Sequence, residues 1–336
     1  MIEIEGSSGG QILRTSVALS AVKKIPCRVF NIRKSRPKPG LQTQHLFGLQ
    51  ALSQICQGRL EGDYLGSQEI KFYPGEINKK SISVNIPTAG SITLVLQTLI
   101  PPILFAPAPV KVSFQGGATD TFFSPTLDHF RYVFLKILEK MGAKLDINIL
   151  RRGYYPEGGS FLEVTIYPSK LRSINLGERG SLQKILAISG AAESLRDKKV
   201  SERQTSGVRD ILGKLKLPLE QIVEYYDTSS PGSQICLLAE FENTVIGTDN
   251  LGKLGKRVED VGREAALELL QEERTGACLD KHLADQILPY MALSEKKSKV
   301  KVSEITSHCK NNMWVIKKFI EGKFEVKTNS ITWAPK

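Results

Sequence analysis

The sequence predicts a mixed α/β (α+β) protein with three repeated βαβαββ-type units forming a large domain and a smaller α/β domain inserted into it. Three observations predict this fold. Apolar helical runs alternate with strand-like segments, two long stretches among the first 180 residues repeat one pattern, and the pattern changes between about residues 181 and 273. We therefore expect units one and two in residues 1–180, the inserted domain in 181–273, and the third unit in 274–336.

Each of the first two units is expected to begin with a helix. SGGQILRTSVALSAVKKIPCRVFNIR, from Ser8, reads as a glycine turn, an apolar helix carrying Gln11, a break at proline and an alternating strand. AGSITLVLQTLIPPILFAPAPVKVSFQGG, from Ala89, follows the same plan with Gln97 in its helix. The shared order predicts two copies of one βαβ arrangement.

The second part of each unit is expected to open with a proline-containing loop and a histidine-bearing helix. His45 follows RPKPGLQTQ, His129 follows SPTLD, and each unit closes on a strand that ends in Tyr-Pro, at Tyr73 and Tyr167. The second copy is longer around the hairpin GYYPEGGS. Two units of roughly βαβαββ type follow.

The rest of the chain is expected to hold the insert and a shorter third copy. In the insert, SLQKILAISGAAESL, VRDILGKL and EAALELLQEE are expected as helices, and QIVEYYD and SQICLLAEF as strands. The third copy would comprise the helix ACLDKHLADQILPYMALS, the strand KVKVSEI, and a helix with strands in NNMWVIKKFIEGKFEVKTNSITWAP. His308 then lies where each unit starts its second helix.

The amino-acid composition limits the classes of partner that this protein could bind. Lysine and arginine number 46 against 35 acidic residues, a net charge of +11, which favours nucleic acid or nucleotide, with a merely soluble basic surface as the alternative. Five scattered cysteines without a CxxC pair indicate neither a disulfide framework nor a zinc knuckle. Apolar runs are too short to span a membrane, and the first residues, MIEIEGSSGG, lack the features of a secretory signal. We expect a cytoplasmic protein with no membrane partner.

The segment ITSHCKNN places His308 at the expected start of a helix. A helix N-terminus disfavours imidazolium and favours bound phosphate, which suits a neutral histidine that attacks phosphorus. Thr306 or Ser307 could cap the helix, and Asn311 and Asn312 could donate to phosphate oxygens. The structural alternative is a histidine that is hydrogen-bonded to its own helix start.

Two other motifs predict little. GTDNLGK, from Gly247, nearly matches the phosphate-loop spacing GxxxxGK, but Leu254 stands where a serine or threonine would hold Mg²⁺. Cys278 and His282 are four residues apart and could share a helix face, yet no further pair of metal-type residues accompanies them. Neither a phosphate loop nor a zinc site is expected.

Eight segments in order resemble the RNA 3'-terminal phosphate cyclase family: SGGQILRTSVALS, RPKPGLQTQH, AGSITLVLQT, GGATD, RGYYPEGG, LGERG, HLADQILPYMAL and ITSHCKNN. The resemblance implies a three-unit fold with a small insert and a nucleotidyl transfer. In that reaction a histidine attacks the α-phosphate of ATP and releases pyrophosphate. The AMP then passes to an RNA 3'-phosphate, and the neighbouring 2'-hydroxyl displaces it to leave a 2',3'-cyclic phosphate. His308 matches that histidine.

The resemblance also implies the remaining site residues and partners. ATP, a divalent cation (Mg²⁺ or Mn²⁺) and RNA with a 3'-phosphate end are the implied partners, with no metal ligands assigned. The residues that match nucleotide contacts are Gln97, His282, Leu283, Ala284, Asp285, Gln286, Arg14, Pro125 and Glu5. The residues that match RNA or phosphate contacts are Arg33, Arg36, Lys38 and Gln44.

Two positions depart from the family pattern. His282 stands where a tyrosine is familiar, and the first residues read IEIEGSSGGQ, shorter than the usual I-D-G-S-x-G-E-G-G-G-Q, so that Glu5 replaces the usual acidic residue only in one alignment. Two other functions are considered. One is a non-catalytic, cyclase-like RNA-binding factor in ribosomal RNA processing, although such relatives lack the histidine that His308 matches. The other is an enolpyruvyl transferase of similar architecture, against which the segments RPKPGLQTQH and HLADQ argue.

Overall fold

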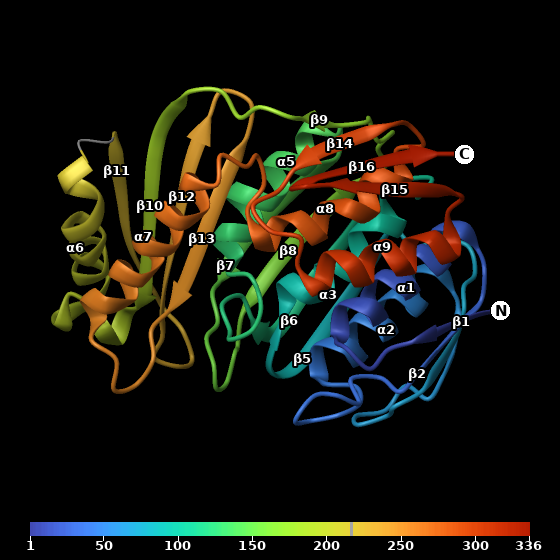
Figure 1. The fold of residues 1–336 in the computed structure, drawn as a ribbon. Helices are drawn as coiled ribbons and strands as arrows, with labels where there is room; N and C mark the ends of the chain where they lie inside the picture. Colours follow the sequence, from blue (N-terminus) through green and yellow to red (C-terminus); the bar gives the residue numbers. More distant parts are fainter. Residues whose placement is uncertain (216–217) are drawn as a thin grey trace.

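A computed structural model describes residues 1–215 and 218–336. These residues form a mixed α/β protein with four four-stranded sheets, helices packed between and upon them, and the two chain ends on the same side of the molecule in Figure 1. In this part of the chain no helix combines the length and the apolar character that a bilayer crossing would need.

The first sheet has the strand order β1-β2-β4-β3 and carries two helices. The pair β1–β2 is parallel, and β4 pairs antiparallel with both β2 and β3. The elements are β1 (Ile2–Glu5), α1 (Gly10–Lys23), β2 (Cys27–Phe30), α2 (Thr43–Cys56), β3 (Arg59–Glu61) and β4 (Ile70–Tyr73).

The second sheet has the order β5-β6-β8-β7, with β5–β6 parallel and the other pairs antiparallel. The helix expected after SPT is divided into a short α-helical turn, a π-helical segment and α5. The elements are β5 (Ser81–Ser91), α3 (Ile92–Ile103), β6 (Val110–Ala118), α4 (Leu127–His129), the π-helix η1 (Phe130–Phe134), α5 (Leu135–Lys140), β7 (Lys144–Arg151) and β8 (Phe161–Tyr167).

The third sheet combines a strand that precedes the insert with the last elements of the chain. Its order is β15-β16-β14-β9, in which β9–β14 is parallel and β16 pairs antiparallel with β14 and β15. The elements are β9 (Asn175–Leu176), α8 (Lys281–Leu293), β14 (Ser298–Lys301), α9 (Ser307–Phe319), β15 (Gly322–Lys327) and β16 (Ser330–Pro335).

The fourth sheet, ordered β11-β10-β12-β13, lies at the far left of Figure 1 with α6 and α7 on its outer face. Its elements are β10 (Leu182–Ala192), the 3-10 helix η2 (Glu193–Lys198), α6 (Val200–Leu212), the 3-10 helix η3 (Gly213–Leu215), β11 (Leu219–Tyr226), β12 (Ser233–Phe241), β13 (Val245–Leu251) and α7 (Val258–Arg274). QIVEYYD and SQICLLAEF are strands and EAALELLQEE lies in a helix, as expected.

The expected helix SLQKILAISGAAESL is instead strand β10 followed by a 3-10 turn, so that prediction is wrong. The strand runs centrally between β11 and β12, and its residues from Ile188 to Ala192 are buried. An apolar run buried on both faces suits a central strand, and pairing with distant neighbours outweighs the helix propensity of its alanines and leucines. GTDNLGK is also not a phosphate loop, because most of it forms strand β13.

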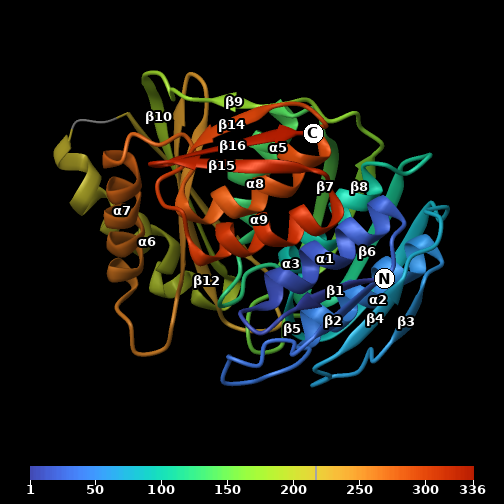
Figure 2. The ribbon, with the colours of Figure 1, turned by 45° about the vertical axis from the view of Figure 1, so that its right-hand side comes forward.

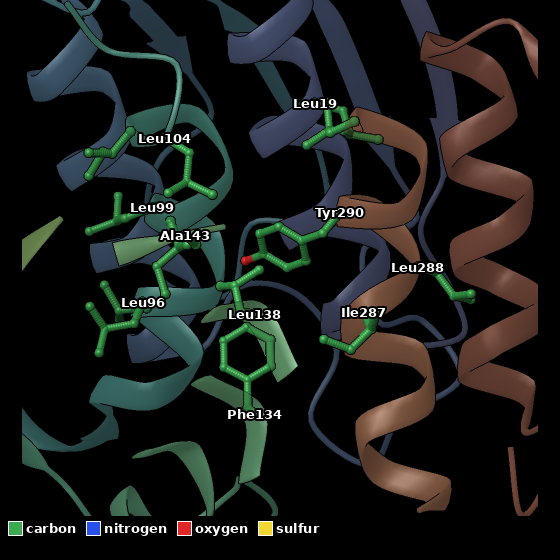
Figure 3. Close-up of a cluster of buried hydrophobic side chains, with 14 of the residues drawn as sticks. Leu19, Leu96, Leu99, Leu104, Phe134, Leu138, Ala143, Ile287, Leu288 and Tyr290 are labelled. Carbon is green, nitrogen blue, oxygen red and sulfur yellow. The ribbon is translucent and has the colours of Figure 1, made fainter. Parts of the chain in front are cut away.

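Two hydrophobic cores lie on either side of the fourth sheet. One joins the inner face of α6 and α7 to residues such as Ile185, Leu237 and Ile246. The other, much larger, includes Ile188, Leu238 and Val245 together with the helices between the remaining sheets. Figure 3 shows the middle of this larger core, where Phe134 and Tyr290 point toward leucines of α3 and α5; their ring centroids are 5.9 Å apart.

A buried polar cluster joins the second sheet to the fourth. Arg152, only 2% exposed, donates from Nη1 to Asp120 Oδ2 at 3.1 Å and from Nη2 to Asp128. Gln234 of β12 donates to the other oxygen of Asp128 at 3.2 Å and accepts from Tyr154. Each carboxylate in the cluster thus has hydrogen-bonded partners, which fixes how the fourth sheet sits against the second.

Candidate active site

His308 is the second residue of α9, and the predicted cap is confirmed. Thr306 is the N-cap, and its hydroxyl accepts a hydrogen bond from the Cys309 amide at 3.2 Å. The imidazole is exposed at the helix start. Desolvation by its surroundings lowers the pKa of His308, and the charges of Arg14, Arg36 and His282 lower it further. The lowered pKa favours the neutral imidazole at pH 7, which is the form that can act as a base or a nucleophile.

Helix α1 is hydrogen-bonded to the first turns of α9. Gln11 Nε2 donates to the backbone oxygen of His308 at 3.2 Å, and one turn later Thr15 Oγ1 donates to Asn312 Oδ1 at 2.9 Å. Asn312 is buried, and its Nδ2 donates to the Asp285 carbonyl at 2.9 Å. Asn312 was expected to donate to phosphate, but its amide instead links α1, α8 and α9.

Arg14 and Asp285 face each other without forming an ion pair. Burial raises the pKa of Asp285 to about 7, although the charges of Arg14 and His282 oppose the shift. Burial lowers the pKa of Arg14 to about 10, against the attraction of Asp285. Within the described residues, the Arg14 guanidinium has neither a salt bridge nor a hydrogen bond. A desolvated cation without a bonded counterion is suited to bind an anion from solution.

Helices α3 and α8 meet through their predicted glutamines. Gln97 Nε2 donates to Gln286 Oε1 at 2.9 Å, and Gln286 Nε2 donates to the His282 carbonyl at 2.8 Å. His282 lies 3.8 Å from Glu268, whose hydrogen bond raises the pKa of the imidazole. In contrast, Leu283 and Ala284 are fully buried. Their side chains face the core, so a nucleotide could reach these two residues only through the backbone.

The loop after β2 brings the predicted basic residues to the start of α1. Arg36 Nε donates to the Ser8 carbonyl at 3.1 Å, and its charge reaches His308. Arg33 Nη1 instead donates to the carbonyls of Lys38 and Gly40, at 2.7 and 3.1 Å, so this side chain braces its own loop. The Lys38 side chain is exposed.

Two glycines permit this close approach. A Cβ on Gly9 would lie 3.3 Å from Arg36 Nη2, and one on Gly10 would lie 2.1 Å from His45 Nε2. His45 is buried, and its Nδ1 accepts from the Gln42 amide at 3.1 Å. Only a residue without a side chain fits at Gly10, which brings the N-termini of α1 and α2 together.

The last three predicted residues, Glu5, Gln44 and Pro125, lie outside the lining of the pocket described below. Glu5 ends β1, and its carboxylate accepts from the Ser7 hydroxyl at 2.9 Å. The Pro125 carbonyl accepts from Thr93 Oγ1 at 2.9 Å, one helical turn before Gln97 on α3. Gln44 is half-buried near the start of α2.

A shallow pocket opens between α1, α3, α8 and α9, and its empty space of about 440 Å³ includes space that is open to solvent. Its apolar floor comes from the core of Figure 3, through Leu19, Phe134 and Tyr290. Its polar wall comprises Gln11, Arg14, Gln97, Asp285, Gln286 and Asn312. Several predicted residues from distant parts of the sequence therefore share one pocket.

Sequence reasoning missed Thr15 and assigned no role to Gln11 or Asp280. Asp280 caps α8 by accepting from the His282 and Leu283 amides, at 3.0 and 2.8 Å, and also from the Gly247 amide of β13 at 3.1 Å. The Asp before HLADQ was a visible capping signal for α8. The contacts of Gln11 and Thr15 cross almost the whole sequence, and no local pattern predicts them.

No group of three or more histidine, cysteine or acidic side chains is arranged to hold a metal ion in residues 1–215 and 218–336. Cys278 is buried and free, and its pKa is raised by burial. It precedes α8, whereas His282 lies inside the helix.

Comparisons with known proteins agree on one family. The model of the family described as RNA 3'-terminal phosphate cyclase matches residues 5–326. The RNA 3'-terminal phosphate cyclase of Pyrococcus abyssi is 43% identical over 97% of this chain and 95% of its own. Its counterparts from Pyrococcus furiosus and Pyrobaculum aerophilum are 44% and 42% identical, over 97% and 95% of this chain and 95% and 92% of theirs.

Among solved structures, the enolpyruvyl transferase NikO from Streptomyces tendae matches with a TM-score of 0.42 and 8% identity, covering 100% of this chain and 48% of that one. A likeness this low bears on neither fold nor function.

Proposed function

The chain belongs to the RNA 3'-terminal phosphate cyclase family, and from that premise we propose that it converts an RNA 3'-phosphate end to a 2',3'-cyclic phosphodiester at the expense of ATP. A nitrogen of His308 attacks the α-phosphorus of ATP, a P–N bond forms and pyrophosphate leaves. A 3'-phosphate oxygen of the RNA then takes the AMP from His308. Finally the 2'-hydroxyl attacks the activated phosphorus, loses its proton and displaces AMP.

The position of His308 carries this proposal. The imidazole is neutral because desolvation and, secondarily, nearby cations lower its pKa, and it lies at a helix start whose amides favour phosphate. Arg14 and Arg36 supply the positive charge that a triphosphate needs, and a guanidinium can bind two phosphate oxygens at once. The neighbouring pocket would receive the nucleoside, with Gln97 and Gln286 as polar contacts, and Pro125 would contact it from outside the pocket lining.

A divalent cation would fit this site only if it were bound together with ATP. Asp285 is the carboxylate in the pocket wall, and Glu5 is turned to Ser7. Mg²⁺ commonly keeps waters and binds one or two carboxylates plus substrate phosphates, so the triphosphate would supply most ligands. The cation would neutralise charge on the phosphates while Arg14 and Arg36 orient them.

We also infer that the first three sheets are copies of one βαβαββ unit and that residues 181–273 form an insert. In each of these sheets a parallel pair is followed by an antiparallel hairpin, in the same order. The insert would divide the third unit after β9, and its separate core behind α6 and α7 supports this interpretation. The predicted cytoplasmic location remains a prediction.

Labelling with [α-³²P]ATP tests the proposed chemistry. We expect a protein adduct that is labile to acid and stable to base, as for phosphorus bonded to nitrogen. The adduct should be absent from His308→Ala and present in Ser307→Ala, a matched change in the same exposed turn. An adduct that persists in His308→Ala would rule out His308 as the carrier of AMP. The absence of any adduct from the wild type would favour the alternative, a non-catalytic RNA-binding factor.

The order of steps can be tested with a modified RNA end. An oligonucleotide ending in a 2'-deoxy 3'-phosphate lacks the hydroxyl that would displace AMP, so an adenylylated end should accumulate. The matching ribose end should give a cyclic phosphate and free AMP, because its hydroxyl is already within reach of the activated phosphorus. Cyclisation of ribose ends without ATP, or by His308→Asn, would contradict the covalent route.

A further inference from the structure

Helix α9 has an outer face that the proposed chemistry does not use. Lys310, Trp314, Lys317 and Lys318 are exposed, whereas the opposite side of the helix is buried against α1 and α8. Figures 1 and 2 both show α9 on the outside of the molecule with no other element in front of it. At about 100° per residue, the three lysines fall within roughly 60° of Trp314 around the helix axis. We call these four residues the α9 face.

The lysines of the α9 face have no acidic partner. Within the described residues, none of the three lies within salt-bridge distance of a carboxylate, whereas Arg28 of β2, Arg59 of β3 and Arg263 of α7 each pair with one. Lys318 lies over the Trp314 ring, with its ammonium 5.4 Å from the ring centre. Three unpaired cations around an accessible aromatic ring form the combination that binds single-stranded nucleic acid, through phosphates and a stacked base.

The direction of the helix connects this face to the reacting end. His308 lies about 120° from Trp314 around the helix, at the border between the α9 face and the pocket. Trp314 follows six residues later, or about 9 Å along the axis at 1.5 Å per residue. An RNA strand with its 3'-phosphate at His308 could therefore reach the ring with one of the next nucleotides, while Lys317 and Lys318 meet phosphates farther along.

We propose that the α9 face binds the single-stranded segment that precedes the 3'-phosphate of the RNA, with one base stacked on Trp314 and phosphates on the lysines. The inference rests on the proposed function, because it takes His308 as the position of the RNA end. It adds a substrate preference: the enzyme favours RNA with several unpaired nucleotides before its 3'-phosphate over a mononucleotide or a blunt duplex end.

Tryptophan fluorescence gives a direct test. The chain has two tryptophans, and Trp333 is fully buried whereas Trp314 is 37% exposed. A hexaribonucleotide with a 3'-phosphate should quench the emission and protect it from iodide, and Trp314→Phe should abolish both changes. If RNA binds and neither the emission nor the iodide quenching responds, no base lies on Trp314 and the proposal is wrong.

Affinity measurements with the same hexamer, labelled at its 5' end, test the energetics. Trp314→Ala should weaken binding by roughly tenfold, as expected for the loss of one stacked base. The doubly substituted Lys317→Ala/Lys318→Ala should lower the slope of log affinity against log salt by about 0.7 for each lost phosphate contact. Neither variant should alter the affinity for a nucleoside 3'-phosphate, which is too short to reach the α9 face.

Two matched controls separate RNA binding at the α9 face from binding elsewhere on the protein. Lys79→Ala/Lys80→Ala removes the same charge from an exposed loop before β5. If this variant loses as much RNA affinity as Lys317→Ala/Lys318→Ala, the loss reflects the net charge of the protein and not contacts with the α9 face. Phe123→Ala removes the most exposed aromatic ring, on the loop that also carries Pro125. A loss in that variant together with an unchanged Trp314→Ala would place the RNA over that loop and overturn the proposal.

The labelling reaction with [α-³²P]ATP distinguishes failure of this inference from failure of the proposed function. It needs no RNA, so the α9-face variants should form the His308 adduct at the wild-type rate. If those variants form the adduct and also bind RNA as tightly as the wild type does, the inference about the α9 face is wrong and the proposed chemistry stands. A wild type that binds the hexamer and forms no adduct would reject the proposed chemistry.

Discussion

Two arginines in this protein, Arg152, which is buried, and Arg14, which is half-buried, differ in their partners. Arg152 donates to two buried carboxylates, Asp120 and Asp128; burial alone would lower its pKa, but the two carboxylates outweigh that and hold it above the ordinary value. Arg14 has no bonded partner among the described residues, and burial lowers its pKa to about 10. The first arginine has its counterions within the fold, whereas the second has no bonded counterion among the described residues.

The contrast indicates how a buried charge is used. A cation that is paired on both sides fixes the position of two segments, here the segment just after β6 with Asp120 and helix α4 with Asp128, and its removal leaves carboxylates without compensation. A cation that is desolvated and unpaired costs stability in the empty protein, and that cost is recovered when a phosphate binds. The same residue type therefore has a structural role at position 152 and a proposed binding role at position 14.

The largest effect is expected from Arg152→Met. The substitution leaves Asp120 and Asp128 buried without their cation, which should lower the free energy of unfolding by about 3–5 kcal/mol. Urea denaturation followed by circular dichroism measures the change. Arg196→Met, which removes an exposed pair with Glu193, is the control and should leave stability almost unchanged, because solvent screens exposed pairs. Equal free energies of unfolding in the two variants would mean that the buried cluster does not stabilise the fold.

Arg14→Met should have the opposite effects to Arg152→Met, with no loss of stability and a large loss of activity. Because Arg14 has no bonded counterion in the empty protein, its replacement removes a desolvation cost, and we expect the free energy of unfolding to stay the same or to rise. Formation of the His308 adduct should slow by about 100-fold, the order of loss for one charged contact to a developing phosphate charge. A stability loss like that of Arg152→Met would show that Arg14 is structural and would remove the contrast.

Only part of this arrangement could be predicted from the sequence. The Thr306 cap and the helix that carries His308 were predictable, because capping and helical periodicity are local signals. Strand β10 was not, since its alanines and leucines suit a helix and its true state depends on pairing with β11 and β12. Asn312 resembled a phosphate donor in ITSHCKNN, yet Thr15 and Asp285, which occupy its amide, lie far away in sequence.

The charge on Asp285 should make stability depend on pH. Its pKa is about 7 in the folded protein and about 3.9 in an unfolded chain, so the folded protein binds more protons between about pH 4 and 7. Stability from this group is greatest below pH 4 and falls as pH rises through 7, by up to about 1.4 kcal/mol per pH unit. Asp285→Asn should remove that slope, and the exposed Asp197→Asn should retain it. Parallel curves for wild type and Asp285→Asn would place the pKa of Asp285 near its ordinary value.

The smallest effect concerns the contact that orients the pocket wall. Thr15→Val keeps the shape of the side chain but removes the hydroxyl that donates to Asn312 Oδ1, leaving a buried acceptor unpaired. We expect a loss of about 1 kcal/mol in the free energy of unfolding. Ser16→Ala is the matched control on the same helix, because its hydroxyl donates only to the Ile12 carbonyl one turn earlier.

Without the Thr15 contact, the Asn312 amide is no longer fixed in orientation against Asp285, and adduct formation at His308 should slow by a few fold at pH 7. If Thr15→Val lowers stability as expected and leaves the adduct rate equal to that of Ser16→Ala, then Asn312 joins α1, α8 and α9 without tuning the site, and the polar wall of the pocket is as structural as the cluster around Arg152.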